Sequence, residues 1–175
     1  MTRKNSLGST FQALETREVP AFVSTYVAGN LRIAFNNNAA TAQSVVISAA
    51  NGYVTLNERV TRIVASNVRS IAVVGSDLNN FIDLRFVSTG TGFRRLDGKV
   101  TISGNGGDDV LIGSQFADKI SGGAGFDQLY AGNGNDTLNG GNGTDWIYPG
   151  YGDDVIVRSP GGDWTDVLEP GDRVV

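Results

Sequence analysis

The 175-residue chain contains no cysteine and no histidine. It therefore forms no disulfide, and it lacks the thiolate and imidazole groups that usually bind zinc, copper or haem. The absence of histidine also excludes a Ser-His-Asp triad and a zinc-protease HExxH motif. Metal binding through oxygen ligands remains open to this chain.

Long apolar runs are absent as well, and no stretch approaches the ~20 apolar residues of a membrane-spanning helix. The opening segment, MTRKNSLGSTFQALETREVPA, lacks the apolar centre of a cleavable signal peptide. We therefore expect any export to use another signal or a region outside this chain. The formal net charge of −4 gives no reason to expect nucleic acid as a partner.

Glycine and aspartate are abundant. The chain has 24 glycines but 4 prolines, and 14 of its 18 acidic residues are aspartate. Aspartate is typical of turns and calcium loops, whereas glutamate favours helices. The composition therefore indicates a turn-rich chain in which carboxylates occupy turns.

Short runs of β-branched and aromatic residues, separated by Asn, Gly and Ser, predict strands in the first part of the chain. The expected strands are 22–27, 31–35, 44–48, 53–56, 62–65, 70–74, 81–84 and 99–102. No long 3.6-residue periodicity appears, so no helix longer than about two turns is expected. Residues 1–20 show no pattern and are predicted to be a flexible leader. The fold class is all-β.

A nine-residue repeat begins at Gly104 and runs without insertion to Val157. Its six frames read GNGGDDVLI, GSQFADKIS, GGAGFDQLY, AGNGNDTLN, GGNGTDWIY and PGYGDDVIV. The sixth position is always aspartate: Asp109, Asp118, Asp127, Asp136, Asp145 and Asp154. The eighth is always Leu or Ile, and the fourth is glycine except at Phe116: Gly107, Gly125, Gly134, Gly143 and Gly152. Six aspartates in phase have a chance probability on the order of one in a million.

This array resembles the hemolysin-type calcium-binding repeats of the repeats-in-toxin (RTX) proteins, whose template is GGxGxDxUx with U a large apolar residue. The resemblance implies Ca²⁺ as the bound ion and a parallel β-roll, a β-solenoid with two strands in each 18-residue coil. Residues 75–83, GSDLNNFID, look like a decayed copy with Asn80 in place of aspartate. Residues 14–21, LETREVPA, resemble a Leu-Glu-x-Arg signature of exported bacterial proteins.

In such a roll, aspartates 18 residues apart lie above one another at the ~4.8 Å spacing of neighbouring strands. Two ligands on opposite sides of a calcium ion are also roughly 4.8 Å apart, because Ca–O distances are about 2.3–2.6 Å. The predicted pairs are Asp109–Asp127, Asp118–Asp136, Asp127–Asp145 and Asp136–Asp154, with carbonyls of the fourth-position glycines completing the shell. Asp145–Asp163 is a fifth pair if the register continues. At Asp118 we expect a distorted or empty site, because Gln115 and Phe116 replace small residues.

The array is strongly acidic. Residues 104–157 contain eight Asp and one Lys, a net charge of −7. Two carboxylates ~5 Å apart repel by roughly 3 kcal/mol at an effective dielectric of 20. We therefore predict that the segment is disordered or partly folded without calcium and forms the roll when calcium binds. A flexible linker and a metal-free solenoid are the alternatives, but the first does not explain the apolar eighth position and the second does not explain the aspartates.

The rest of the chain is expected to flank the roll. Residues 21–103 are predicted to be solenoid coils or a β-rich cap over one end, with a separate ligand-binding β-domain as the alternative. Residues 158–175 are predicted to be a C-terminal cap or tail. An 18-residue coil also stacks Tyr130 with Tyr148 and Trp146 with Trp164 on one face. That face is a candidate contact surface for a glycan, another subunit or the chain's own tail.

The function favoured by these features is that of a non-enzymatic, secreted or cell-surface bacterial protein that binds calcium and has a structural or adhesive role. No catalytic residue is predicted, since the candidate acids left over (Glu58, Asp77, Asp83 and Asp97) form no recognisable constellation. The alternative is a calcium-dependent module that binds polysaccharide or accompanies a polysaccharide-modifying enzyme.

Overall fold

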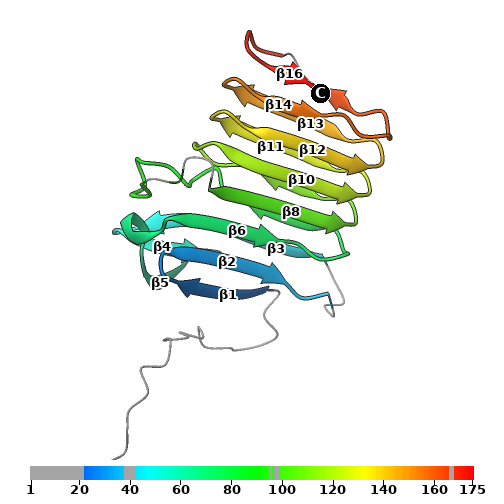
Figure 1. Cartoon of the computed structure of the whole chain (residues 1–175). Helices are drawn as coiled ribbons and strands as arrows, with labels where there is room; N and C mark the ends of the chain where they lie inside the picture. Colours follow the sequence, from blue (N-terminus) through cyan, green and yellow to red (C-terminus); the bar gives the residue numbers. More distant parts are fainter. Residues whose placement is uncertain (1–21, 38–41, 95, 97–98, 166–167) are drawn as a thin grey trace, which may run out of the picture.

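Two eight-stranded sheets contain all the described strands (Figure 1). The computed structural model describes residues 22–37, 42–94, 96, 99–165 and 168–175. The predicted leader and the 14–21 signature therefore lie outside the described residues. Across those ranges the only helical segment is a three-residue 3-10 turn, Ala65–Asn67. Among the same residues, no helix has the length and apolarity needed to cross a membrane.

Strands alternate between the two sheets from β6 to β16. The first sheet contains, in spatial order, β1 (Phe22–Val27), β2 (Asn30–Phe35), β6 (Ser70–Val74), β8 (Val100–Gly106), β10 (Asp118–Ala124), β12 (Thr137–Asn142), β14 (Val155–Val157) and β16 (Arg173–Val174). The second contains β15 (Trp164–Thr165), β13 (Trp146–Tyr151), β11 (Gln128–Asn133), β9 (Val110–Ile112), β7 (Asn80–Asp83), β3 (Gln43–Ala50), β4 (Tyr53–Leu56) and β5 (Arg59–Val64).

Pairing along the array is parallel with a step of 18 residues. Ile120 pairs with Leu138 in the first sheet, and Leu129 pairs with Ile147 in the second. One coil, defined as one strand in each sheet with its two turns, therefore takes two nonapeptides, which is consistent with a β-roll. Immediately before the array the step is 29 residues in both sheets, as in Ile71–Val100 and Ile82–Leu111.

The additional length lies in the loop after β7. Leu84, Val87 and Phe93 on this loop are fully buried, so the loop packs into the core. The core itself is a ladder of inward side chains, because residues on a strand alternate between its two faces. All the eighth-position residues of the array are buried with at most 2 % exposure. They are Leu111, Ile120, Leu129, Leu138, Ile147 and Ile156.

Four strands of the array, β10 to β13, are longer than the three residues expected from the nonapeptide, whereas β9 and β14 have three. β10 continues from the end of one frame into the first three positions of the next, and Gly123 pairs with Gly141 there. Gly122 and Gly123, at the start of one frame, therefore belong to the sheet ladder as well as to the turn. The reason is that the 18-residue register of neighbouring parallel coils is the same before and after the boundary between the two frames.

Antiparallel hairpins end both sheets at the N-terminal side (Figure 1). β1 pairs antiparallel with β2, and β4 pairs antiparallel with both β3 and β5. The β3–β4 turn is Asn51–Gly52 with φ of 52° and 79°, the positive values of a type I′ hairpin turn. The first strands of the chain thus combine parallel coil strands with antiparallel hairpins. The domain limits at residues 20, 103 and 157 stay predictions.

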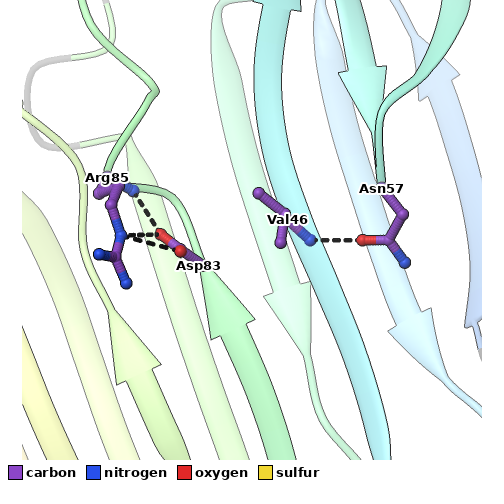
Figure 2. A network of polar contacts seen from close by, with 4 residues as sticks. All are labelled: Val46, Asn57, Asp83 and Arg85. Atoms are coloured by element: carbon purple, nitrogen blue, oxygen red, sulfur yellow. Dashed lines mark hydrogen bonds and ion pairs between the residues drawn. The ribbon is translucent and has the colours of Figure 1, made fainter.

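Two side chains, Asn57 and Asp83, make polar contacts in the N-terminal half of the second sheet (Figure 2). Asn57 lies along the edge of β3, where its Oδ1 accepts the Val46 N–H at 2.7 Å and its Nδ2 donates to Ser44 O at 3.1 Å. Asp83 is buried and forms an ion pair with Arg85 at 2.8 Å. The first contact covers an edge that would otherwise pair with another strand, and the second neutralises one of the acids outside the array.

Candidate metal centre

The sixth-position side chains form two rows, one on each side of the paired sheets. The first row precedes or begins the strands of the second sheet and comprises Asn80, Asp109, Asp127, Asp145 and Asp163. The second row does the same for the first sheet and comprises Asp118, Asp136, Asp154 and Asp172. All six array aspartates are at most 4 % exposed. Buried carboxylates need a compensating partner, so each row requires one.

One oxygen of most of these carboxylates has a partner in the preceding coil. The Oδ1 atom accepts the backbone N–H of the residue one coil earlier, as in Asp109 N–H to Asp127 Oδ1 at 2.8 Å. The same bond joins Asp118–Asp136, Asp127–Asp145 and Asp136–Asp154 at 2.7–2.9 Å. These are four of the predicted pairs. For the fifth, the Trp164 N–H donates to Asp145 O at 2.8 Å, which stacks Asp163 on Asp145.

The structure adds one pair that the sequence analysis missed. The Asp154 N–H donates to Asp172 Oδ1 at 2.9 Å. Asp172 lies 18 residues after Asp154, and Val174 follows at the eighth position, paired with Ile156. Continuing the nine-residue frame through residues 158–175 would have found it, because the frame needs only the sixth and eighth positions to be recognisable.

The second carboxylate oxygen has no hydrogen-bond partner among the described residues in five array aspartates. These buried atoms are Oδ2 of Asp109, Asp127, Asp136, Asp145 and Asp154, and we call them the unpaired oxygens. Asp163 has a buried Oδ1 without a partner in the same part of the chain. An unpaired buried oxygen is costly, by about 1–3 kcal/mol and more for a charged group. Each of these turns therefore needs a hydrogen-bond donor or a cation beside its unpaired oxygen.

Burial raises the pKa of these carboxyl groups. It raises the pKa of Asp109 to about 7, of Asp127 to about 6 and of Asp136 to about 8, against an ordinary 3.8. Desolvation is the main cause, opposed by the backbone hydrogen bond and reinforced by the neighbouring carboxylates. The pKa values of Asp145 and Asp154 are also raised, for the same reasons. Without a cation, protons would therefore be held in these turns near neutral pH.

Glycines bring backbone carbonyl oxygens close to the same turns. The fourth-position glycines have φ between 87° and 145°, a region that favours glycine. A Cβ on Gly143 would stand 1.9 Å from Gly125 O, one coil away. A Cβ on Gly122 would stand 2.3 Å from Asp127 Oδ2 and 2.5 Å from Gly140 O. Backbone carbonyl oxygens and carboxylate oxygens therefore lie close together in these turns.

This donor set fits a hard cation. Within the described ranges, no three acidic side chains converge on one point. A cation would therefore take few carboxylate oxygens per site and draw the remaining ligands from backbone carbonyls. Calcium accepts that mixture, because it takes 6–8 oxygen ligands in flexible geometry.

A comparison with protein families decides the identity of the array. Four copies of the RTX calcium-binding nonapeptide repeat match residues 96–120, 112–147, 121–156 and 135–164. Residues 96–164 match the RTX calcium-binding nonapeptide repeat. RTX nonapeptide repeats bind Ca²⁺. The unpaired oxygens are the groups that we expect to hold it. The resemblance found in the nine-residue frames is thus confirmed. No curated protein and no solved structure matches the chain.

One turn of the RTX array differs from the others. Asp118 is buried, but both its carboxylate oxygens accept hydrogen bonds from Ser114. Burial still raises the pKa of Asp118 to about 7, against the lowering effect of those two bonds. Phe116, at the position of the expected glycine, is buried in the core. The metal roles assigned to the individual aspartates and glycines stay predictions.

The predicted aromatic face is present on the second sheet. Tyr130 and Tyr148 stack with ring centroids 4.6 Å apart and planes 3° from parallel. Trp146 pairs in register with Trp164 and packs edge-on against Phe126 at 5.7 Å. Trp164 is 70 % exposed and Trp146 is 43 % exposed. The two tyrosine rings thus pack face to face, whereas the tryptophan side chains are exposed to solvent. A role of this face in binding a partner stays a prediction.

Proposed function

We propose that this chain is a secreted or cell-surface protein whose RTX segment folds into a calcium-loaded parallel β-roll and has a structural or adhesive role. The observation that carries the proposal is the set of five unpaired carboxylate oxygens, three in the first row and two in the second. Each belongs to a buried aspartate whose other oxygen is already bonded to the neighbouring coil. Calcium supplies the missing positive charge at the same point in successive coils.

Calcium is expected to control folding as well as to bind. Residues 104–157 carry a net charge of −7, most of it on the buried rows. A site that exists only in the folded chain converts binding free energy into folding free energy. Proteins with RTX repeats are typically secreted bacterial proteins. Free calcium is scarce inside cells and abundant outside them, so folding would follow export.

A structural role fits the remaining acids better than catalysis does. Hydrolysis by two carboxyl groups needs a pair with separated pKa values in a cleft. Asp83 is paired with Arg85, Asp77 accepts a hydrogen bond from Asn37, and Glu58 lies in a tight turn with φ of 66°. Asp97 lies outside the described residues. The alternative of calcium-dependent polysaccharide binding is favoured by one observation, the exposed Trp146 and Trp164 in register.

Circular dichroism and calorimetry during a calcium titration test the proposal. We expect strong gain of β signal together with heat of binding, and reversal of both by a chelator. A magnesium titration is the control, because Mg²⁺ requires near-ideal octahedral geometry and dehydrates reluctantly. A full β signal in excess chelator, with no heat on adding calcium, would refute the proposal.

A further inference from the structure

Serine occupies the second turn position, four residues before the sixth-position side chain, in three turns. These are Ser76 before Asn80, Ser114 before Asp118 and Ser159 before Asp163. In the frames that contain Asp127, Asp136, Asp145 and Asp154, that position is glycine. The turns of Ser76 and Ser114 also lack the fourth-position glycine, which is Leu78 in one and Phe116 in the other. Their hydrogen bonding differs from that of the glycine turns.

The Ser114 turn is closed by its own side chains. The Ser114 N–H donates to Asp118 Oδ2 at 2.5 Å, and its hydroxyl donates to Asp118 Oδ1 at 2.7 Å. The Phe116 N–H then donates to the Ser114 hydroxyl at 3.0 Å. Both oxygens of Asp118 thus have donors, whereas each glycine turn leaves one carboxylate oxygen unpaired.

The Ser76 turn achieves the same closure with an amide. The Ser76 N–H donates to Asn80 Oδ1 at 2.7 Å, and Asn80 Nδ2 donates to the Ser76 hydroxyl at 3.0 Å. The Leu78 N–H donates to the same hydroxyl at 3.3 Å. A neutral side chain therefore satisfies this turn, so no charge at the sixth position is needed.

The backbone follows the same division. Glycine turns have positive φ at both the second and fourth positions, as at Gly123 (128°) and Gly125 (136°). The turns of Ser76 and Ser114 do not have positive φ at these two positions, which are Ser76 and Leu78 in one turn and Ser114 and Phe116 in the other. The carbonyls that face the unpaired oxygens in glycine turns are therefore oriented differently in serine turns.

Two of the three serine turns, those of Ser76 and Ser114, each begin one of the two rows. The Asn80 N–H donates to Asp109 Oδ1 at 2.7 Å in the first row. The Asp118 N–H donates to Asp136 Oδ1 at 2.7 Å in the second. Asp109 and Asp136 are the first aspartates of their rows that carry an unpaired oxygen. In each row, a turn whose sixth-position side chain is fully hydrogen-bonded (a closed turn) therefore precedes the first turn with an unpaired carboxylate oxygen (an open turn). The closed turn donates a backbone hydrogen bond to that carboxylate.

Resting on the proposed function, we infer that Ser76 and Ser114 take the place of the cation in the first turn of each row. These two turns form without calcium and position Asp109 and Asp136, and calcium-dependent folding begins at those two aspartates. Asp118 then holds no calcium of its own. Ser159 is excluded from this role, because its hydroxyl bonds one oxygen of Asp163 and the other stays buried without a partner.

The number of bound ions distinguishes a closed turn from an open one. Asp118→Asn and Asp136→Asn are isosteric changes one coil apart in the same row of the full chain. We expect Asp118→Asn to bind as many calcium ions as the wild type in equilibrium dialysis, with a midpoint within about twofold, because Asn80 shows that an amide fits. Asp136→Asn should lose at least one ion. Loss of an ion in Asp118→Asn equal to that in Asp136→Asn overturns the inference.

Hydrogen exchange in chelator tests the closure itself and does not depend on calcium binding. We expect the amides of Ser76, Ser114 and Phe116 to exchange at least tenfold more slowly than those of the glycine turn before Asp136. Ser114→Ala should abolish that protection at Phe116, while Ser121→Ala, a control outside any turn, should not. Equal exchange in serine and glycine turns overturns the inference. Absence of calcium binding by the wild type would instead refute the proposed function.

Discussion

Gly141→Ala is expected to be far more damaging than Gly92→Ala, although the two glycines have nearly the same backbone conformation. Their φ angles are 107° and 106°. Alanine at either position therefore incurs the same left-handed strain of roughly 1–2 kcal/mol. The neighbours differ: a Cβ on Gly141 would stand 2.1 Å from Gly123 O, whereas a Cβ on Gly92 would stand 3.8 Å from the nearest atom, Ala65 Cβ.

The overlap at Gly141 sets the size of the difference. A carbonyl oxygen 2.1 Å from a methyl carbon must move by more than an ångström to reach ordinary contact. That oxygen belongs to the paired sheet on the neighbouring coil, so the coils must separate locally. Overpacking in a well-packed region typically costs about 1–3 kcal/mol and occasionally more. We expect Gly141→Ala to lose about 4 kcal/mol of folding free energy, and Gly92→Ala about 1–2 kcal/mol.

Chemical denaturation in saturating calcium, followed by circular dichroism, measures both losses. The calcium midpoint gives a second readout, since Gly141→Ala displaces a carbonyl beside the metal-binding turns whereas Gly92 lies on the loop after β7. Equal destabilisation of the two variants would refute the reasoning. It would show that backbone strain alone, and not the close approach of coils, explains glycine at the second turn position.

Three further predictions concern the carboxylates and the exposed aromatics. Asp127→Asn should raise the calcium midpoint more than Asp109→Asn in a titration followed by circular dichroism, because Asp127 lies between two aspartates and Asp109 between Asn80 and Asp127. The pKa values of Asp109, Asp127 and Asp136 are raised from 3.8 to about 7, 6 and 8, so the metal-free fold binds more protons than the unfolded chain. The stability of the metal-free fold should be greatest below about pH 4 and should fall as the pH rises through about 8. Calcium affinity should rise over the same pH interval. Denaturation in chelator in which stability rises with pH would contradict this prediction. Trp164→Ser should weaken retention on a polysaccharide column in calcium without changing the calcium midpoint, and unchanged retention would remove the binding role of that face.

Much of the array could be predicted from the sequence because its repeat has a fixed length. The inward Leu and Ile, the buried aspartates and the stacked Tyr130–Tyr148 pair all follow from a nine-residue frame and an 18-residue coil. The expected strands before the array also appear, with ends shifted by up to four residues. These features depend on side-chain alternation, which sequence displays directly.

The features that could not be predicted depend on contacts rather than on period. The Ser114 closure requires a side chain to turn back on its own frame, and one serine in a variable position carries no signal of that. The antiparallel hairpins before the array depend on positive φ at turns such as Ala28–Gly29, which the nine-residue spacing of apolar residues does not reveal.

The alternation of strands between the two sheets restricts how this array can change in length. Each nonapeptide places its aspartate in the row opposite to that of the preceding one. An insertion or deletion of one nonapeptide would transfer every later carboxylate to the other row and every later aromatic to the other sheet. A change of two would preserve both rows and the Trp146–Trp164 register. Duplication and loss within such an array are therefore neutral in units of 18 residues and disruptive in units of nine, although nine is the period of the sequence.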